Sequence, residues 1–348
     1  MTMMMAAFLV LAILLLLLFL LCFPRQFKPH LHIPSLHGKH VLITGGSSGI
    51  GLALAHHCLL QGSYVTLIAR NADRLSQAAQ SLVHGNLSTS ASGVNGHSAQ
   101  YSKDRILLKA ADVSDAAAMS NAIAESFSWR PIDVLVCNAG TSVNGLFDDM
   151  KISDLETVTR INLLGCVYTI YAALPLMKAR SKRHPSSIVI VSSLSGLLFV
   201  YGANMYSATK HALKGLAEVL RFELLSDNIK VSLVCPGFTE TPLLDLADKH
   251  VIEGNKIFFY DRDYAEAAKV VAAKTMEGVK QGKFLITTSA AGLMVRILAR
   301  GFTPAESLSD ALLEIFLLVP LRVATHVWFP FAKRLIKKQQ KQGLNFKE

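Results

Sequence analysis

Residues 40–61 read HVLITGGSSGIGLALAHHCLLQ, and the architecture can be worked out from this stretch outward. Its apolar start at 40–44 is typical of a buried strand, and the pattern from 49 to 61 predicts a helix. The glycines between them let the backbone turn tightly and approach a pyrophosphate, whose negative charge is favoured at a helix N-terminus. The stretch therefore predicts a dinucleotide site. Its expected contacts are Gly45, Ser47, Ser48, Gly49 and Ile50.

The same alternation of short apolar runs and amphipathic stretches continues to Thr287. Further strands are expected at 64–68, 105–110, 134–137, 187–192, 230–234 and 284–287, and further helices at 115–128, 152–180, 203–227 and 264–280. Strands that alternate with helices predict a parallel sheet. We expect one α/β domain over residues 38–290, a doubly wound, Rossmann-type parallel sheet of seven strands. Residues 85–104, rich in Ser, Gly and Asn, are expected to form a solvated insertion loop.

The composition excludes several classes of protein. Of the 348 residues, 51% are apolar and 17% are charged, which excludes disordered, collagen-like and disulfide-rich chains. Five scattered cysteines favour a reducing compartment, and neither they nor the histidines have metal-ligand spacing, so no metal is expected. The net charge of +10 includes a basic tail at 333–348, directly after an apolar stretch. This placement predicts a membrane surface rather than a nucleic acid as the partner.

An unbroken apolar run, AAFLVLAILLLLLFLLCF, occupies residues 6–23. As a helix it would be about 27 Å long, close to the roughly 30 Å of a hydrocarbon core. A cleaved signal peptide is the alternative, but no Lys or Arg precedes the run and no A-x-A site follows it. We expect a transmembrane anchor at 1–24 and a linker at 25–37. Because Arg25 and Lys28 follow the run, the positive-inside rule places the next domain in the cytosol.

Two more apolar stretches, 284–299 and 311–332, lie near the C-terminus. They contain arginines, a glutamate and two prolines, which are costly in a span exposed to lipid. We therefore expect residues 291–332 to form membrane-associated helices at the interface, with full spanning as the alternative. These helices could also form the mouth of a lipophilic substrate site.

The end of the second strand predicts which dinucleotide binds. An NAD site places an acid there to bind the ribose 2′-hydroxyl, whereas an NADP site lacks the acid and supplies Arg for the 2′-phosphate. Positions 69–71 read ARN, and Arg74 follows Arg70 by one helical turn. This pattern predicts NADPH as the cofactor.

Two further strand ends are candidate cofactor contacts. Asp112 and Val113 follow the third strand and are expected beside the adenine, with a simple turn of the chain as the alternative. Asn138 opens the NAG motif at 138–140, where small residues let a cofactor lie close to the backbone.

Tyr206 and Lys210 share one face of a predicted helix, and Ser193 lies 13 residues before the tyrosine. An ammonium about 4 Å from a phenol contributes about 4 kcal/mol at an effective dielectric near 20. This attraction would lower the pKa of the tyrosine from about 10 toward 7, where a phenol can exchange protons at cellular pH. The three residues predict a proton-transfer site beside the dinucleotide.

TGGSSGIG at 44–51, NAG at 138–140, Asn162 and the pattern Ser193…Tyr206-x-x-x-Lys210 resemble the short-chain dehydrogenase/reductase family over residues 38 to 290. The resemblance implies that Tyr206 is the general acid and that Ser193 polarises a ketone. It implies that Lys210 lowers the pKa of the tyrosine and holds the nicotinamide ribose, and that Tyr206 also contacts the cofactor.

The family pattern adds two residues to the site. It implies that Asn162 positions a water in the proton relay, and that Thr239, in the loop after the sixth strand, caps the nicotinamide side. Ser192 is adjacent to Ser193, and spacing alone favours Ser193.

Within the family, the N-terminal anchor, the pairing of GGSSGIG with LIARN and the apolar C-terminal region resemble the branch that reduces the 3-keto group of 3-ketosphinganine to sphinganine. The resemblance implies an NADPH-dependent reductase of the endoplasmic reticulum membrane, facing the cytosol, with this lipophilic ketone as substrate. A steroid or retinoid dehydrogenase of the same family is the alternative, differing in the substrate loop near 239–260. A non-catalytic NADPH-sensing protein is a rival from another class, against which the intact Tyr206 and Lys210 argue. Helices 152–180 and 203–227 could pair between subunits as the family's do, which allows for a homo-oligomer.

Overall fold

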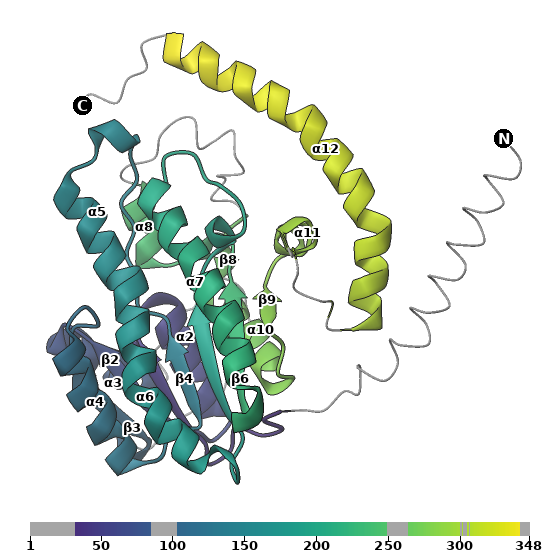
Figure 1. The fold of residues 1–348 in the computed structure, drawn as a ribbon. Helices are drawn as coiled ribbons and strands as arrows, with labels where there is room; N and C mark the ends of the chain where they lie inside the picture. Colours follow the sequence, from purple (N-terminus) through teal and green to yellow (C-terminus); the bar gives the residue numbers. More distant parts are fainter. Residues whose placement is uncertain are drawn as a thin grey trace, which may run out of the picture.

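The computed structural model describes residues 32–84, 103–248, 264–299, 301, 305 and 307–341. Its centre is a seven-stranded parallel sheet in the order β3-β2-β1-β4-β5-β6-β9 (Figure 1). The strands are β1 (His40–Thr44), β2 (Tyr64–Ala69), β3 (Ile106–Ala110), β4 (Val134–Cys137), β5 (Ser186–Val191), β6 (Ile229–Cys235) and β9 (Leu285–Thr287). Each strand expected from the sequence is present, with ends that differ by at most one residue. The doubly wound, Rossmann-type sheet is confirmed.

Helices cover both faces of this sheet, so β4 is buried along its whole length. One face packs against α2 (Gly49–Leu60), α3 (Ala72–Val83) and α10 (Ala268–Lys280). The other packs against α4 (Ala116–Trp129), α6 (Gly165–Ser181) and α7 (Asn204–Glu223). The strand order reverses between β1 and β4, where a doubly wound sheet opens a crevice at the carboxyl ends of its strands.

Three elements differ from the expected pattern. The helix expected at 152–180 is α5 (Ile152–Thr159), a π-turn η4 (Arg160–Leu164) and then α6. The helix expected at 203–227 ends at Glu223 and is followed by the 3-10 turn η6 (Leu225–Asp227), after which Asn228 has φ of 51°. Glu266–Ala267 form β8, which pairs with β7 (Thr239–Glu240) instead of beginning α10. The pairing of β7 with β8 joins residues distant in the chain, which a local sequence pattern does not contain.

Residues 32–37 pack against the domain although they fall in the expected linker. The backbone N–H groups of His32 and Ile33 both donate to the carbonyl oxygen of Lys280. The side chains of Ile33 and Leu36 are buried in the core beside α2. The expected anchor at 1–24, the linker up to residue 31, the insertion at 85–102 and the tail from 342 lie outside the described residues.

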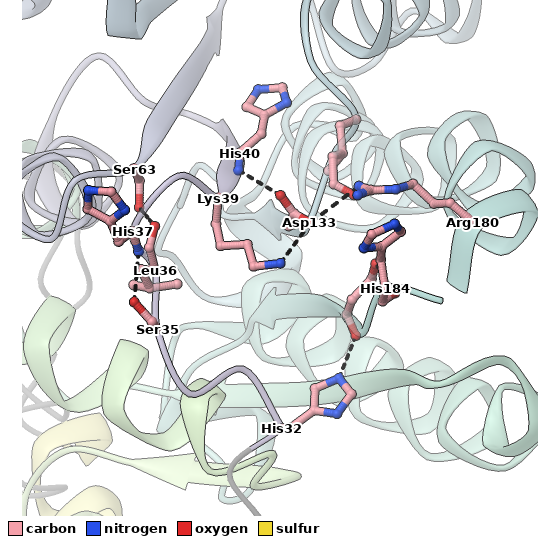
Figure 2. A network of polar contacts seen from close by, with 12 residues as sticks. His32, Ser35, Leu36, His37, Lys39, His40, Ser63, Asp133, Arg180 and His184 are labelled. Atoms are coloured by element: carbon pink, nitrogen blue, oxygen red, sulfur yellow. Dashed lines mark hydrogen bonds and ion pairs between the residues drawn. The ribbon is translucent and has the colours of Figure 1, made fainter. Parts of the chain in front are cut away.

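Asp133 joins three elements at the amino end of the sheet, as Figure 2 shows. Its carboxylate accepts from the backbone N–H of His40 at 2.9 Å, from Lys39 Nζ at 3.5 Å and from Arg180 at 3.3 Å. A buried carboxylate needs such partners. The network therefore joins β1, β4 and α6 at the amino end of the sheet, opposite the crevice.

Two helices, α11 (Ala290–Ala299) and α12 (Leu308–Lys341), follow β9. Figure 1 shows α12 as a long helix beside the domain, with α11 between them. α12 runs through the expected border at 332/333 between the apolar region and the basic tail. In the described part of the chain, Ile152–Ser181 and Leu308–Trp328 are long and apolar enough to cross a membrane, by length and composition alone. The first is a core helix, whereas only 6% of the second is buried.

Candidate active site

A cavity of about 940 Å³ lies at the carboxyl ends of the strands, where the strand order reverses. Its wall begins at the glycine turn, passes the ends of β2 to β6 and α7, and ends between α11 and α12. The predicted site residues that line it are Gly45, Ser47, Ser48, Gly49, Ile50, Arg70, Arg74, Asp112, Val113, Asn138, Ser193, Tyr206, Lys210 and Thr239. The fold therefore brings fourteen of the fifteen predicted residues to one cavity.

The glycine turn has the shape that a dinucleotide pyrophosphate requires. Gly45 and Gly49 have φ of 67° and 54°, a left-handed region that favours glycine. A Cβ at Gly51 would lie 2.3 Å from the carbonyl oxygen of Gly45, so the helix and the turn touch backbone to backbone. The first backbone N–H groups of a helix have no partner within it. In α2 they belong to the segment directly after the glycine turn, whose residues line the cavity. The cradle fits a phosphate group at the N-terminus of α2.

Asn138 holds this turn in place from the neighbouring strand. Its side-chain nitrogen lies 3.1 Å from the carbonyl oxygen of Thr44 and 3.3 Å from that of Gly45. Its backbone N–H donates to Thr44 Oγ1 at 3.0 Å. These contacts show how Asn138 shapes the floor of the cavity.

Arg70 and Arg74 both line the cavity, the first directly after β2 and the second in the first turn of α3. The side chain of Arg70 is 66% exposed and lies 3.8 Å from the carboxylate of Asp112. Asp112 accepts from the backbone N–H and the hydroxyl of Ser114, so it also shapes the turn after β3. Two guanidinium groups beside an open groove can receive a phosphate.

The proposed proton-transfer residues come from α7 and the end of β5. The hydroxyl of Ser193 lies close enough to that of Tyr206 to lower the pKa of the phenol, and it accepts from the backbone N–H of Ser195 at 3.1 Å. Ser192 faces the other way, and its hydroxyl donates to the carbonyl oxygen of Lys210 at 2.9 Å. A Cβ at Gly196 would lie 2.5 Å from Ser192 Oγ and 2.6 Å from the same carbonyl oxygen, so the segment after β5 packs tightly on α7. The geometry thus places Ser193, not Ser192, beside the tyrosine.

Burial controls the protonation of the Tyr206–Lys210 pair. It raises the pKa of Tyr206 above its ordinary value, which the hydrogen bond from Ser193 only partly offsets, and it lowers the pKa of Lys210 to about 8. The expected lowering of the tyrosine pKa toward 7 is therefore wrong. Lys210 Nζ lies 5.5 Å from the centre of the phenol ring and donates to the carbonyl oxygen of Val191 at 3.0 Å. The phenol stays protonated at neutral pH.

Asn162 does not line the cavity but lies behind its wall, in the π-turn. Its side-chain oxygen accepts from the backbone N–H of Thr141 at 2.8 Å, and its nitrogen donates to the carbonyl oxygen of the same residue at 2.9 Å. A Cβ at Gly140 would lie 3.4 Å from this oxygen and 3.7 Å from Lys210 Nζ. The side chain therefore holds the NAG segment next to the lysine.

The loop after β6 contributes a residue that the sequence reasoning did not include. Thr239 lies in β7, and Thr241 follows it with its hydroxyl hydrogen-bonded to the carbonyl oxygen of Thr239. A Cβ at Gly49 would lie 3.0 Å from the methyl group of Thr241, so this loop covers the glycine turn. Thr241 precedes Pro242 at the start of α8 (Pro242–Asp248), a cap signal that could have identified it.

No cluster of His, Cys, Asp and Glu with the geometry of a metal site occurs among the residues that the structure describes. The four cysteines in the described ranges are buried and free. The polar side chains that line the cavity are hydroxyls, amides, the amine of Lys210, guanidinium groups and the carboxylate of Asp112.

Comparisons with known proteins agree with this geometry. The profile of the short chain dehydrogenase family matches residues 39–251. A 3-dehydrosphinganine reductase of Arabidopsis thaliana is 37% identical over 300 residues, which cover 86% of this chain and 84% of the relative. The 3-ketodihydrosphingosine reductase of Mus musculus is 33% identical over 283 residues, covering 81% and 80%. A short chain dehydrogenase/reductase from Burkholderia phymatum, solved in complex with NAD, has a TM-score of 0.64 at 23% identity, covering 76% of this chain and 94% of that structure. The last likeness shows the fold.

Proposed function

Because the chain belongs to the short-chain dehydrogenase family, we propose that it reduces the 3-keto group of 3-ketosphinganine to sphinganine with NADPH. The contact between Tyr206 and Ser193 carries this proposal. Both residues line the same cavity as the glycine turn and the apolar side chains of α11 and α12. Relatives named for reduction of this sphingoid ketone, similar over more than four fifths of the chain, support the choice of substrate.

The preference for NADPH rests on Arg70 and Arg74. No acid stands at the end of β2 to bind a ribose 2′-hydroxyl, and two guanidinium groups lie at the groove instead. Hydrogen bonds to a charged group contribute about 1.5–3 kcal/mol each, so two contacts with the 2′-phosphate imply at least a tenfold preference. Gly45 to Ile50 would hold the pyrophosphate, and Asp112 and Val113 would lie beside the adenine.

The protein's own residues supply the proton and the alignment, while the bound cofactor supplies a hydride to the ketone carbon. Tyr206 remains protonated because burial raises its pKa, and it donates this proton to the carbonyl oxygen as negative charge develops there. Ser193 donates a hydrogen bond to the same oxygen and aligns the ketone. The ammonium of Lys210 holds the nicotinamide ribose and favours the phenolate left behind. Asn162 keeps the wall beside the lysine in place, and Thr239 caps the nicotinamide side.

We also assign the protein to the endoplasmic reticulum membrane, with the catalytic domain in the cytosol. The apolar run at 6–23 lies outside the described residues and would be the anchor. In α12, Phe316, Val319 and Val327 are 72%, 67% and 72% exposed, and the basic Lys333 and Arg334 follow them. An exposed apolar stripe followed by basic residues suits an interfacial helix on an anionic leaflet.

Turnover by the purified full-length protein tests the proposal. We expect NADPH oxidation that depends on 3-ketosphinganine, and kcat/KM at least tenfold higher with NADPH than with NADH. Tyr206→Phe should lower kcat by about 10² to 10⁴, because it removes the transferable proton, while NADPH binding stays close to normal. Efficient turnover of steroid ketones or retinal without turnover of 3-ketosphinganine would replace the substrate assignment. Near-normal activity of Tyr206→Phe would contradict the mechanism.

A further inference from the structure

The active-site cavity extends beyond the catalytic residues, into a groove between α11 and α12. Leu194, next to Ser193, forms the junction. A Cβ at Gly292, in the first turn of α11, would lie 3.6 Å from Leu194 Cδ2, so this helix begins directly beside the reacting centre. Figure 1 shows α11 between the domain and α12. A molecule whose ketone lies at Tyr206 thus has its continuation in this groove.

The two walls of the groove are facing helical stripes. On α11 the lining residues Ala291, Met294, Val295 and Leu298 fall at helical spacing. On α12 the lining stripe is formed by Leu321, Ala324, Thr325 and Trp328. Arg322 of α12 also lines the cavity, but its guanidinium donates to the carbonyl oxygen of Leu298, so the rest of the wall is mostly apolar and suits an apolar occupant.

Two polar contacts hold the walls together outside the apolar stripes. Arg296 of α11 pairs with Asp310 of α12 at 2.7 Å, with side chains only 11% and 14% exposed. Arg322 donates to the carbonyl oxygen of Leu298 at 3.0 Å. Because a charged pair and a charge-assisted hydrogen bond join α11 to α12, the width of the groove is defined without a ligand.

We propose that this groove holds the alkyl chain of the substrate. Its lining side chains, Leu298 and Trp328 among them, set the preferred chain length. The proposal rests on the proposed function, because it assigns the tail of the ketone whose head lies at Tyr206. Each methylene that enters the groove should raise kcat/KM about two- to fourfold, and the gain should stop where the chain leaves the groove.

A matched pair of variants on α12 tests the assignment. Ala324 lines the groove, whereas its neighbour Val323 is 59% exposed and does not line the cavity. Ala324→Phe should lower kcat/KM for the eighteen-carbon ketone at least tenfold and leave that for an eight-carbon analogue within twofold. Val323→Phe should change neither. Equal chain-length profiles for the two variants would overturn the assignment, even if 3-ketosphinganine is the substrate.

Trp328 supplies a readout that does not depend on turnover. The chain has two tryptophans, and Trp129 lies against His40 and Tyr64 at the amino end of the sheet. In a Trp129→Phe background, an eighteen-carbon amine with a nitroxide on its chain should quench Trp328 fluorescence. Adding Ala324→Phe should abolish the quenching, and adding Val323→Phe should not.

The two readouts separate the possible failures. If the wild-type protein reduces no long-chain ketone, the proposed function fails. Quenching of Trp328 then still shows whether an alkyl chain binds in the groove. If the ketone is reduced but Trp328 is not quenched, the groove assignment fails and the function stands.

Discussion

The adjacent serines after β5 have different partners, which separates their roles. Ser193 lies beside Tyr206 and accepts from the backbone N–H of Ser195, whereas Ser192 is 4% exposed and donates to the backbone of Lys210. Spacing in the sequence could not distinguish them. The two serines differ because the hydroxyl of Ser192 points to the backbone of α7 and that of Ser193 does not.

Replacing each serine in turn should therefore give different defects. Ser193→Ala should lower kcat by about 10² to 10³, because it removes a donor to the developing oxyanion. Ser192→Ala should lower the free energy of unfolding by about 1–2 kcal/mol and leave kcat within a few-fold. Steady-state kinetics and denaturant unfolding on the same preparations check both. The reverse pattern would assign catalysis to Ser192.

The rate of reduction should fall as the pH rises through about 8. The charged form of Lys210 is present below its pKa of about 8 and is lost above it, whereas the raised pKa of Tyr206 keeps the phenol protonated in the same window. The alkaline limb of kcat/KM thus belongs to the lysine. Lys210→Arg, which stays charged, should move that limb to higher pH. A limb that does not move in the active variant would contradict this assignment.

At the scale of elements, the π-turn η4 and the loop after β6 shape the walls of the site. η4 turns Asn162 inward, and its amide contacts both backbone groups of Thr141. The loop after β6 brings Thr241 over the glycine turn. Single π-turns within helices often mark functional sites, and this one supports the wall beside Lys210.

One of the two polar contacts between α11 and α12 is a buried ion pair. Asp310→Asn leaves Arg296 without its anionic partner, and breaking a buried pair of this kind typically costs about 3–5 kcal/mol. Amide hydrogen exchange in residues 308–328 should accelerate at least tenfold, and exchange in α2 should stay unchanged. Ser309→Ala, at the adjacent position, is the control and should leave both helices as they are. Unchanged protection of 308–328 would show that other contacts hold α12.

At the scale of the whole molecule, the amino and carboxyl ends of the parallel strands have different roles. The Asp133 network joins β1, β4 and α6 at the amino end (Figure 2). The cavity occupies the carboxyl end. α12, with its exposed apolar stripe, stands beside the cavity. On the proposed membrane assignment, α12 would bring the bilayer surface next to the cavity that contains Tyr206.

The proposed orientation predicts how intact microsomes respond to protease. With the catalytic domain in the cytosol, added protease should digest the chain beyond Arg25 without detergent. Protection of the whole domain until the membrane is dissolved would reverse the orientation. It would also expose the Asn86-Leu87-Ser88 sequon to the glycosylation machinery.

The sequence alone was enough for the seven strands, the glycine turn and the Tyr206-x-x-x-Lys210 face, because their signals lie within a few residues of each other. Only the tertiary structure decided the rest. The raised pKa of Tyr206, the choice of Ser193 over Ser192 and the inward turn of Asn162 all depend on burial and on partners distant in the chain. The groove is formed by α11 and α12, which the sequence placed at the membrane and at the mouth of a lipophilic substrate site without showing which of their faces meet. Their facing stripes are opposed because Arg296 meets Asp310 across the gap, a contact that no local pattern contains.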